Sequence, residues 1–153
     1  LAGADMTSTA VTATKATAFT RASDAGITLT DVLATLKVYL GRDLPADYKS
    51  PFNLVAADFD ANGVVNLSDV LGLLKYYLGR TPPPTADKAW AFVNAADVSS
   101  DGLHIAGLNG NLSKTDVHLN APALDTSNNS VTLIGVVRGD VDGSWAALHP
   151  TGG

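Results

Sequence analysis

Apolar residues recur at the spacing of one helix face in two similar stretches of the chain. In residues 65–80 they occupy positions 67, 70, 71, 74 and 78, a pattern typical of a helix that buries one side. Residues 27–42 align with this stretch without a gap, and most positions are identical, including the closing Leu-Gly-Arg. A unit repeated at this distance predicts copies that cover each other's apolar faces. We therefore expect two packed helices. The first should cover about residues 30–40 and end at Gly41, and the second should end at Gly79.

The remaining segments alternate short apolar runs with turn residues. Ser50-Pro51 has the composition of a helix start and predicts a short helix that leads toward residue 57. After the prolines at 82–84, β-prone runs are separated by Gly, Asn, Asp and Ser, as in a small antiparallel sheet. These runs are residues 90–93, 103–105, 117–119 and 131–137. The expected fold class is therefore α+β.

The domain organisation follows from these patterns. Residues 1–19 are small and β-branched and predict either a linker or an edge strand. Residues 20–81 contain the duplicated helical unit, and residues 86–150 form the β-rich part. Because a piece of that size is marginally stable alone, we expect the β-rich part to pack on the helices, with Trp90 and Trp145 contributing to a shared core.

The segment before the second helix carries the ligands of a calcium loop in order. Residues 58–69 place oxygen-bearing side chains at loop positions 1, 3, 5, 9 and 12, with glycine at position 6 and a free backbone carbonyl at position 7. Calcium prefers roughly six to eight oxygen ligands, which alternate residues of a tight loop can direct inward. A surface turn rich in Asp and Asn by chance is the alternative. The pattern favours a calcium site formed by Asp58, Asp60, Asn62, Val64, Asn66 and Asp69.

The matching loop before the first helix is incomplete. Counted back from Asp31, loop positions 1, 3, 5 and 6 fall on Thr20, Ala22, Asp24 and Ala25. Two charged ligands and the turn glycine are therefore missing. We expect this loop to keep its shape without calcium or to bind calcium weakly.

The duplicated loop and helix, each closed by Leu-Gly-Arg, resemble a type I dockerin module, the duplicated calcium-binding domain of bacterial extracellular proteins. The resemblance covers roughly residues 20–81 and implies calcium ligation by the six residues named above, with Asn66 acting through water. It also implies docking to a cohesin-like protein domain through loop positions 10 and 11. Many dockerins carry Ser-Thr there, whereas this chain has Leu29, Thr30, Leu67 and Ser68.

Two Asp-rich turns in the C-terminal half are weaker candidates for metal binding. Asp97, Ser99 and Asp101 match loop positions 1, 3 and 5, but no carboxylate closes that loop. Asp140 and Asp142 offer two carboxylates in a turn. For both segments an ordinary Asp-Gly turn is the favoured interpretation. The segment around Asp140 also resembles the C-terminal modules of large secreted bacterial calcium-binding and adhesin-like proteins.

Charge and composition exclude several classes of partner. The net charge of −5 argues against nucleic acid and anionic membrane surfaces, because both attract basic proteins. No run approaches the roughly 20 apolar residues of a membrane span, and without cysteine the chain has neither disulfides nor a zinc–thiolate site. An acidic surface with calcium ligands fits a secreted, extracellular or cell-surface location. The start without Met or a basic leader predicts a piece of a larger polypeptide.

The sequence lacks the motifs of a catalytic site. No nucleophile elbow, phosphate loop or His-Glu-x-x-His occurs, and His104, His118 and His149 share no metal spacing. We therefore expect a non-enzymatic calcium-binding module of a secreted bacterial protein that mediates docking to a cohesin-like partner or attachment. The alternatives are a calcium-stabilised structural C-terminal module of an adhesin-like protein and, less favoured, an accessory domain of an extracellular carbohydrate-active enzyme.

Overall fold

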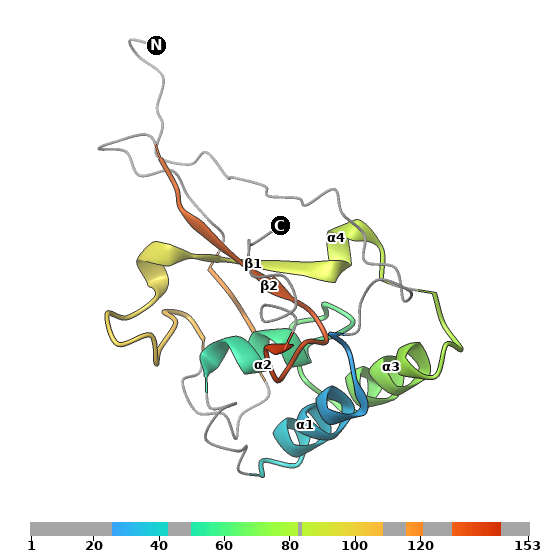
Figure 1. Cartoon of the computed structure of the whole chain (residues 1–153). Coiled ribbons are helices and arrows are strands. Elements are labelled where there is room, and N and C mark those ends of the chain that lie inside the picture. Colours follow the sequence, from blue (N-terminus) through green and yellow to red (C-terminus); the bar gives the residue numbers. More distant parts are fainter. Residues whose placement is uncertain (1–25, 43–49, 83, 109–115, 121–129, 145–153) are drawn as a thin grey trace.

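The helices come mainly from the first half of the chain and the strands from the second. The computed structural model describes residues 26–42, 50–82, 84–108, 116–120 and 130–144. In chain order the elements are α1 (Leu29–Tyr39), α2 (Pro51–Ala57), α3 (Leu67–Tyr77), α4 (Ala86–Ala89), β1 (Trp90–Asn94), the 3-10 helix η2 (Ala95–Asp97) and β2 (Leu133–Val137). α1 and α3 lie side by side, and α2 contacts both α1 and β2 (Figure 1). The fold class is therefore α+β, as predicted.

α1 and α3 begin in the same way because each carries a capping box. At the start of α1, the side chain of Thr28 caps the helix, and the Asp31 carboxylate accepts the N–H of Thr28 at 2.7 Å. At the start of α3, Asn66 is the cap, and the Asp69 carboxylate accepts its N–H at 2.8 Å. These bonds satisfy backbone groups that a helix start otherwise leaves unpaired. The same local chemistry therefore starts both copies of the repeat.

The two repeated helices also end alike. Each is followed by a glycine with a positive φ, 62° at Gly41 and 68° at Gly79. The left-handed conformation stops a helix and favours glycine, which has no Cβ to clash. The predicted ends of both helices are confirmed to within one residue.

α2 is the short helix predicted at Ser50-Pro51. Ser50 is its N-cap, and Pro51 is its first residue. The side-chain oxygen of Asn53 accepts the N–H of Ser50 at 2.7 Å, while Asn53 Nδ2 donates to the carbonyl of Val141. Asn53 is buried, so its side chain links α2 to the segment that follows β2. α2 therefore holds that segment close to the loop that begins at residue 58.

Within the described part of the chain, the sheet has two strands, fewer than the sequence predicts. β1 and β2 pair antiparallel, from Trp90 opposite Val137 to Asn94 opposite Leu133. In the described residues, the runs at 103–105 and 117–119 do not form strands. The first contributes an isolated bridge between Val98 and Ile105, and the second lies beside a bridge between Val64 and Asp116. Their β-prone residues are buried singly, such as Ile105, instead of along a shared sheet face.

Two clusters of buried side chains connect the helices to the strands. In the first, Leu54 of α2 and Val93 of β1 are members of one apolar core. In the second, Leu73 of α3 lies with Trp90 of β1 and Val137 of β2. Trp90 thus occupies the helical core, as the sequence suggests, whereas Trp145 and residues 1–19 lie outside the described residues. Among the helices in the described ranges, none is both long and apolar enough to span a bilayer.

Candidate metal centre

The continuous loop, residues 58–69, joins α2 to α3 and gathers three carboxylates. Asp58 ends α2 and Asn66 caps α3, so the two helices fix both ends of the loop. One carboxylate oxygen from each of Asp58, Asp60 and Asp69 lies within 4.8 Å of the other two. Asp58 and Asp69 are buried, and Asp60 is half-buried. This group of oxygens could hold a metal ion.

Backbone N–H groups hold these carboxylates in place. Asp58 Oδ1 accepts the N–H of Asn62 at 3.1 Å and that of Gly63 at 3.3 Å. Asp69 Oδ1 accepts the N–H of Asp60 at 3.1 Å. Gly63 has a φ of 86°, which is the left-handed turn that a glycine at loop position 6 allows. The loop therefore wraps around its acidic group.

The other donors predicted for this loop form hydrogen bonds within it. Asn62 Oδ1 accepts the N–H of Val64 at 2.9 Å, and Asn66 Oδ1 accepts the N–H of Ser68 at 2.7 Å. The carbonyl of Val64 accepts Asn66 Nδ2 at 3.3 Å. Asn62, Val64 and Asn66 therefore shape the loop, while the acidic group itself consists of three aspartates.

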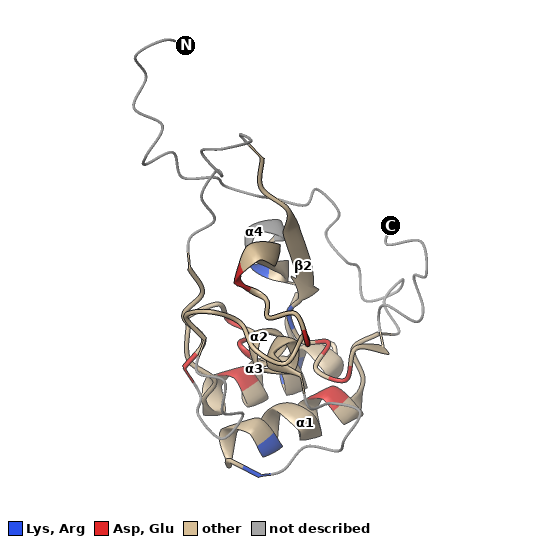
Figure 2. Cartoon of the chain, turned by 90° about the vertical axis from the view of Figure 1, so that its left-hand side faces the viewer, with Lys and Arg blue, Asp and Glu red and all other residues tan. Residues whose placement is uncertain are grey.

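A second group of three acids joins two distant parts of the chain. One carboxylate oxygen from each of Asp31, Asp140 and Asp142 lies within 4.8 Å of the other two. Asp31 belongs to α1 and the other two follow β2, and Figure 2 shows acidic residues where these segments meet. The N–H of Asp142 donates to Asp31 Oδ1 at 3.1 Å, and the Ser144 hydroxyl donates to the carbonyl of Gly26 at 3.0 Å. We call residues 140–144 together with residues 26–31 the split loop.

The split loop repeats the hydrogen bonds of the continuous loop. The N–H of Asp142 reaches Asp31 Oδ1, as the N–H of Asp60 reaches Asp69 Oδ1, and both distances are 3.1 Å. The N–H of Ser144 donates to Asp142 Oδ1 at 2.9 Å. In the continuous loop, the N–H of Asn62 at position 5 likewise donates to Asp60 Oδ1 at position 3, at 3.1 Å. Positions 1, 3, 5, 7, 9 and 12 of the split loop are therefore Asp140, Asp142, Ser144, Gly26, Thr28 and Asp31.

The sequence alone did not show that the two halves of the split loop belong together. The stretch before Asp31 lacks carboxylates at positions 1 and 3, and the turn with Asp140 and Asp142 lacks a closing carboxylate, so each half is incomplete alone. The signal in the sequence was that each half supplies what the other lacks. An ordinary turn at Asp140 does not account for the contact with Asp31. In the sequence alignment, positions 1, 3, 5 and 6 of the first loop fall on residues between 20 and 25, which lie outside the described residues.

Burial raises the pKa of several of these carboxyl groups. Desolvation raises the pKa of Asp31 to about 6, and it also raises the pKa of Asp58 and of Asp69. At Asp58 the positive charge of Arg138 opposes this rise. A buried carboxylate is costly to ionise unless a cation balances it. A hard divalent cation with a preference for oxygen, such as calcium, fits this set of donors.

We expect the metal-free protein to lose stability as the pH rises from about 4 to about 6. The pKa of Asp31 is about 6 in the folded chain against an ordinary 3.8, so the unfolded chain releases this proton first and ionisation favours unfolding. Below both values the effect vanishes, and above about 6 it is complete. Urea unfolding in EDTA across this range measures it, and Asp31→Asn should flatten the profile. A wild-type stability that rises with pH in this window would contradict a raised pKa of Asp31 in the folded protein.

The third acidic segment does not form a comparable group. Ser99 Oγ donates to Asp101 Oδ1, and this bond is the main cause of a lowered pKa at Asp101. Asp97 Oδ2 accepts Asn120 Nδ2 at 3.4 Å instead. Neither acidic group found in the described part of the chain includes Asp97 or Asp101. His104 Nδ1 lies 3.8 Å from Asp101 Oδ1, and both side chains are exposed. Because Gly102 has a positive φ of 70°, this segment fits an ordinary Asp-Gly turn.

The residues aligned with partner-binding positions lie on the surface. Leu29 and Leu67 are 46% and 47% exposed, and Thr30 and Ser68 beside them are exposed as well. All four stand in the first turns of α1 and α3. The two copies of the repeat therefore present the same pair of positions to solvent.

No protein-family model, curated protein or solved structure matches the chain. The geometry of the two acidic groups is therefore the main basis for assigning a function.

Proposed function

We propose that the chain is a calcium-binding module built from two dockerin-like loop–helix units, in which one loop is continuous and the other is split. The observation that supports this most is the presence of two acidic groups with the same hydrogen-bond pattern, each at the start of a repeated helix. A chance cluster of surface acids would not be expected to recur at equivalent positions of a duplicated sequence. Burial of Asp31, Asp58 and Asp69 adds a need for positive charge.

Calcium is the cation that these donors favour. The donors are carboxylates, amides, hydroxyls and backbone carbonyls, which are all hard oxygen ligands, and the chain has no cysteine. The flexible coordination of calcium suits a loop that combines side-chain and backbone oxygens, whereas magnesium demands a nearly ideal octahedron. Three carboxylates at each site predict a dissociation constant in the broad range of roughly 10⁻⁷–10⁻³ M. That range includes sites that operate in extracellular fluids.

The split loop gives calcium a structural role in this proposal. Asp31 and Asp142 are more than 100 positions apart in the chain, and their contact brings the segment after β2 to the start of α1. An ion bound by Asp31, Asp140 and Asp142 would hold these segments together in the folded state alone. It would therefore stabilise the fold by mass action, because the unfolded chain offers no such site.

Titration with calcium tests the proposal through a matched pair of variants. We expect calorimetry to find two sites in the wild type, and one site in either Asp60→Asn or Asp142→Asn. These residues occupy position 3 of the continuous and the split loop respectively, so each change removes one ligand charge from one site. Asp101→Asn is the control, since Asp101 is exposed and belongs to neither group.

The outcomes separate the two sites from one another. A single wild-type site that disappears in Asp60→Asn and persists in Asp142→Asn would contradict calcium binding by the split loop. No heat of binding in any protein, together with unchanged unfolding, would contradict the function as a whole.

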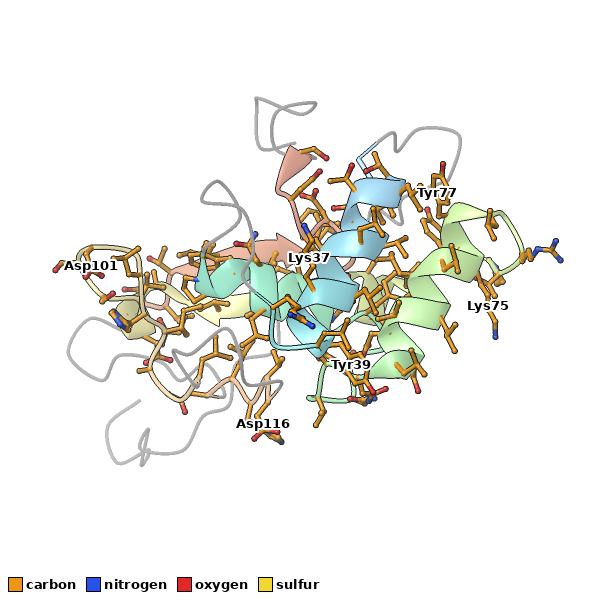
Figure 3. The ribbon with its side chains drawn as sticks, turned by 90° about the horizontal axis from the view of Figure 1, so that it is seen from below. Lys37, Tyr39, Lys75, Tyr77, Asp101 and Asp116 are labelled. Atoms are coloured by element: carbon orange, nitrogen blue, oxygen red, sulfur yellow. The ribbon has the colours of Figure 1, made fainter. Side chains whose placement is uncertain are left out.

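Docking to a cohesin-like domain is a second candidate function, favoured by the surface of the helix pair. Leu33 and Leu71, at equivalent positions of the repeat, are 51% and 45% exposed. Figure 3 shows Lys37 on α1 and Lys75 on α3, so each helix also carries a basic residue. An apolar surface with basic neighbours suits a partner with an apolar patch and an acidic rim. A pull-down from a bacterial secretome, with and without calcium and with the Leu33→Ser, Leu71→Ser double variant, tests this function.

A further inference from the structure

Arg138 lies directly against the first ligand of the continuous loop. Its Nη1 is 3.0 Å from Asp58 Oδ2 and 3.0 Å from the Asp58 carbonyl oxygen. The side chain of Arg138 is 14% exposed, and that of Asp58 is 3% exposed. Arg138 Nε is buried and finds no hydrogen-bond partner among the described residues. The guanidinium is therefore mostly removed from water, and Asp58 is its paired carboxylate.

The backbone around Arg138 fixes this contact. The N–H of Arg138 donates to the carbonyl of Ala89 at 3.0 Å, and the N–H of Gly139 donates to the carbonyl of Ala56 at 2.7 Å. Ala56 lies in α2, two positions before Asp58. Separation of Arg138 from Asp58 therefore requires the arginine side chain to rotate, because both backbones are held in place.

A divalent ion at the continuous loop would meet the positive charge of Arg138 across the same carboxylate. Two like charges a few ångströms apart repel strongly in a site that is largely shielded from water. Arginine does not relieve this repulsion by losing its proton, since its pKa is too high. Asp58 must then divide its negative charge between the guanidinium and the ion. The loop should therefore bind calcium less tightly than its ligand set alone would allow.

We propose that Arg138 is an internal counter-cation, which stabilises the continuous loop without calcium and lowers its affinity for calcium. This inference rests on the proposed calcium function and specifies how the affinity of that site is set. Without the ion, Arg138 balances the buried charge of Asp58. With the ion bound, Arg138 opposes it, and this shifts the site toward the weaker end of the range of calcium affinities.

The test compares neutral and charged replacements of Arg138 in the Asp142→Asn background, where the continuous loop is the site that titrates. We expect Arg138→Met to bind calcium at least about tenfold more tightly, because one nearby positive charge is removed. The urea midpoint in EDTA should fall in the same variant, because Asp58 loses its partner. Arg138→Gln keeps a hydrogen-bond donor and should shift the affinity in the same direction. Arg138→Lys should stay within about threefold of the parent.

The control is Arg80→Met, which removes the same charge from an exposed position after α3 and should leave the affinity unchanged. Calcium affinity that is unchanged or lower in both neutral Arg138 variants would overturn the proposal, because Arg138 would then orient Asp58 for the ion instead of opposing it. A parent that binds no calcium would refute the calcium function itself. A parent that binds calcium, with no gain in the neutral variants, would refute the role of Arg138 alone.

Discussion

Removal of calcium is expected to lower the free energy of unfolding by about 5 kcal/mol when the free ion is present at one hundred times the dissociation constant of both sites. Each site that binds the folded chain alone contributes about 2.7 kcal/mol under this condition, and the two contributions add. For a chain of this length, that loss corresponds to a decrease in Tm of roughly 10–20 °C. Thermal unfolding of the wild type in calcium and in EDTA measures it directly.

The matched control for calcium removal is the double variant Asp60→Asn, Asp142→Asn. It lacks a carboxylate at position 3 of both loops, so its Tm should respond little to EDTA, while each single variant should keep about half of the response. Magnesium at the same concentration should raise the Tm less than calcium does, because magnesium demands an octahedral site and gives up its bound waters reluctantly. A wild-type Tm that is the same in calcium and in EDTA would rule out a stabilising ion at either loop.

The substitution Gly139→Ala is expected to destabilise the protein by about 2–5 kcal/mol. Gly139 has a φ of 95°, where an alanine is strained by about 1–2 kcal/mol. A Cβ at this position would lie 3.0 Å from Leu73 Cδ1 and 3.1 Å from both Ile27 Cδ1 and Phe59 Cδ2. Overpacking of a filled core adds about 1–3 kcal/mol. Urea unfolding in the presence of calcium gives the difference from the wild type.

Gly102→Ala isolates the backbone part of that effect. Gly102 also has a positive φ, 70°, but no heavy atom lies within 4 Å of the position that its Cβ would take. We expect it to cost about 1 kcal/mol, from strain alone. Equal losses in the two variants would show that the apolar side chains around Gly139 move aside freely, and that the β2 end is not held tightly between the two repeats.

Local chemistry determined the two repeated helices, α2 and the grouping of acids in the continuous loop, so the sequence by itself was sufficient to predict them; the short helices α4 and η2, which lie in the part expected to be β-rich, were not predicted. The N-terminal starts of α1 and α3 depend on residues within four positions of each other, such as Thr28 with Asp31 and Asn66 with Asp69. The continuous loop brings its acids together within twelve consecutive residues. Such short-range interactions leave a readable pattern, because spacing along the chain nearly fixes spacing in space.

The tertiary structure alone decided the second acidic group, the contact of Arg138 with Asp58, and the number of strands. Asp31 meets Asp140 and Asp142 because α2 and β2 hold the segment after β2 against the start of α1. No periodicity or spacing records a contact between residues more than 100 positions apart. The runs at 103–105 and 117–119 are β-prone, but strand formation also needs a partner strand, and that depends on where the whole chain packs. The sequence thus specified the parts of each site that are contiguous, while packing determined which separate parts meet.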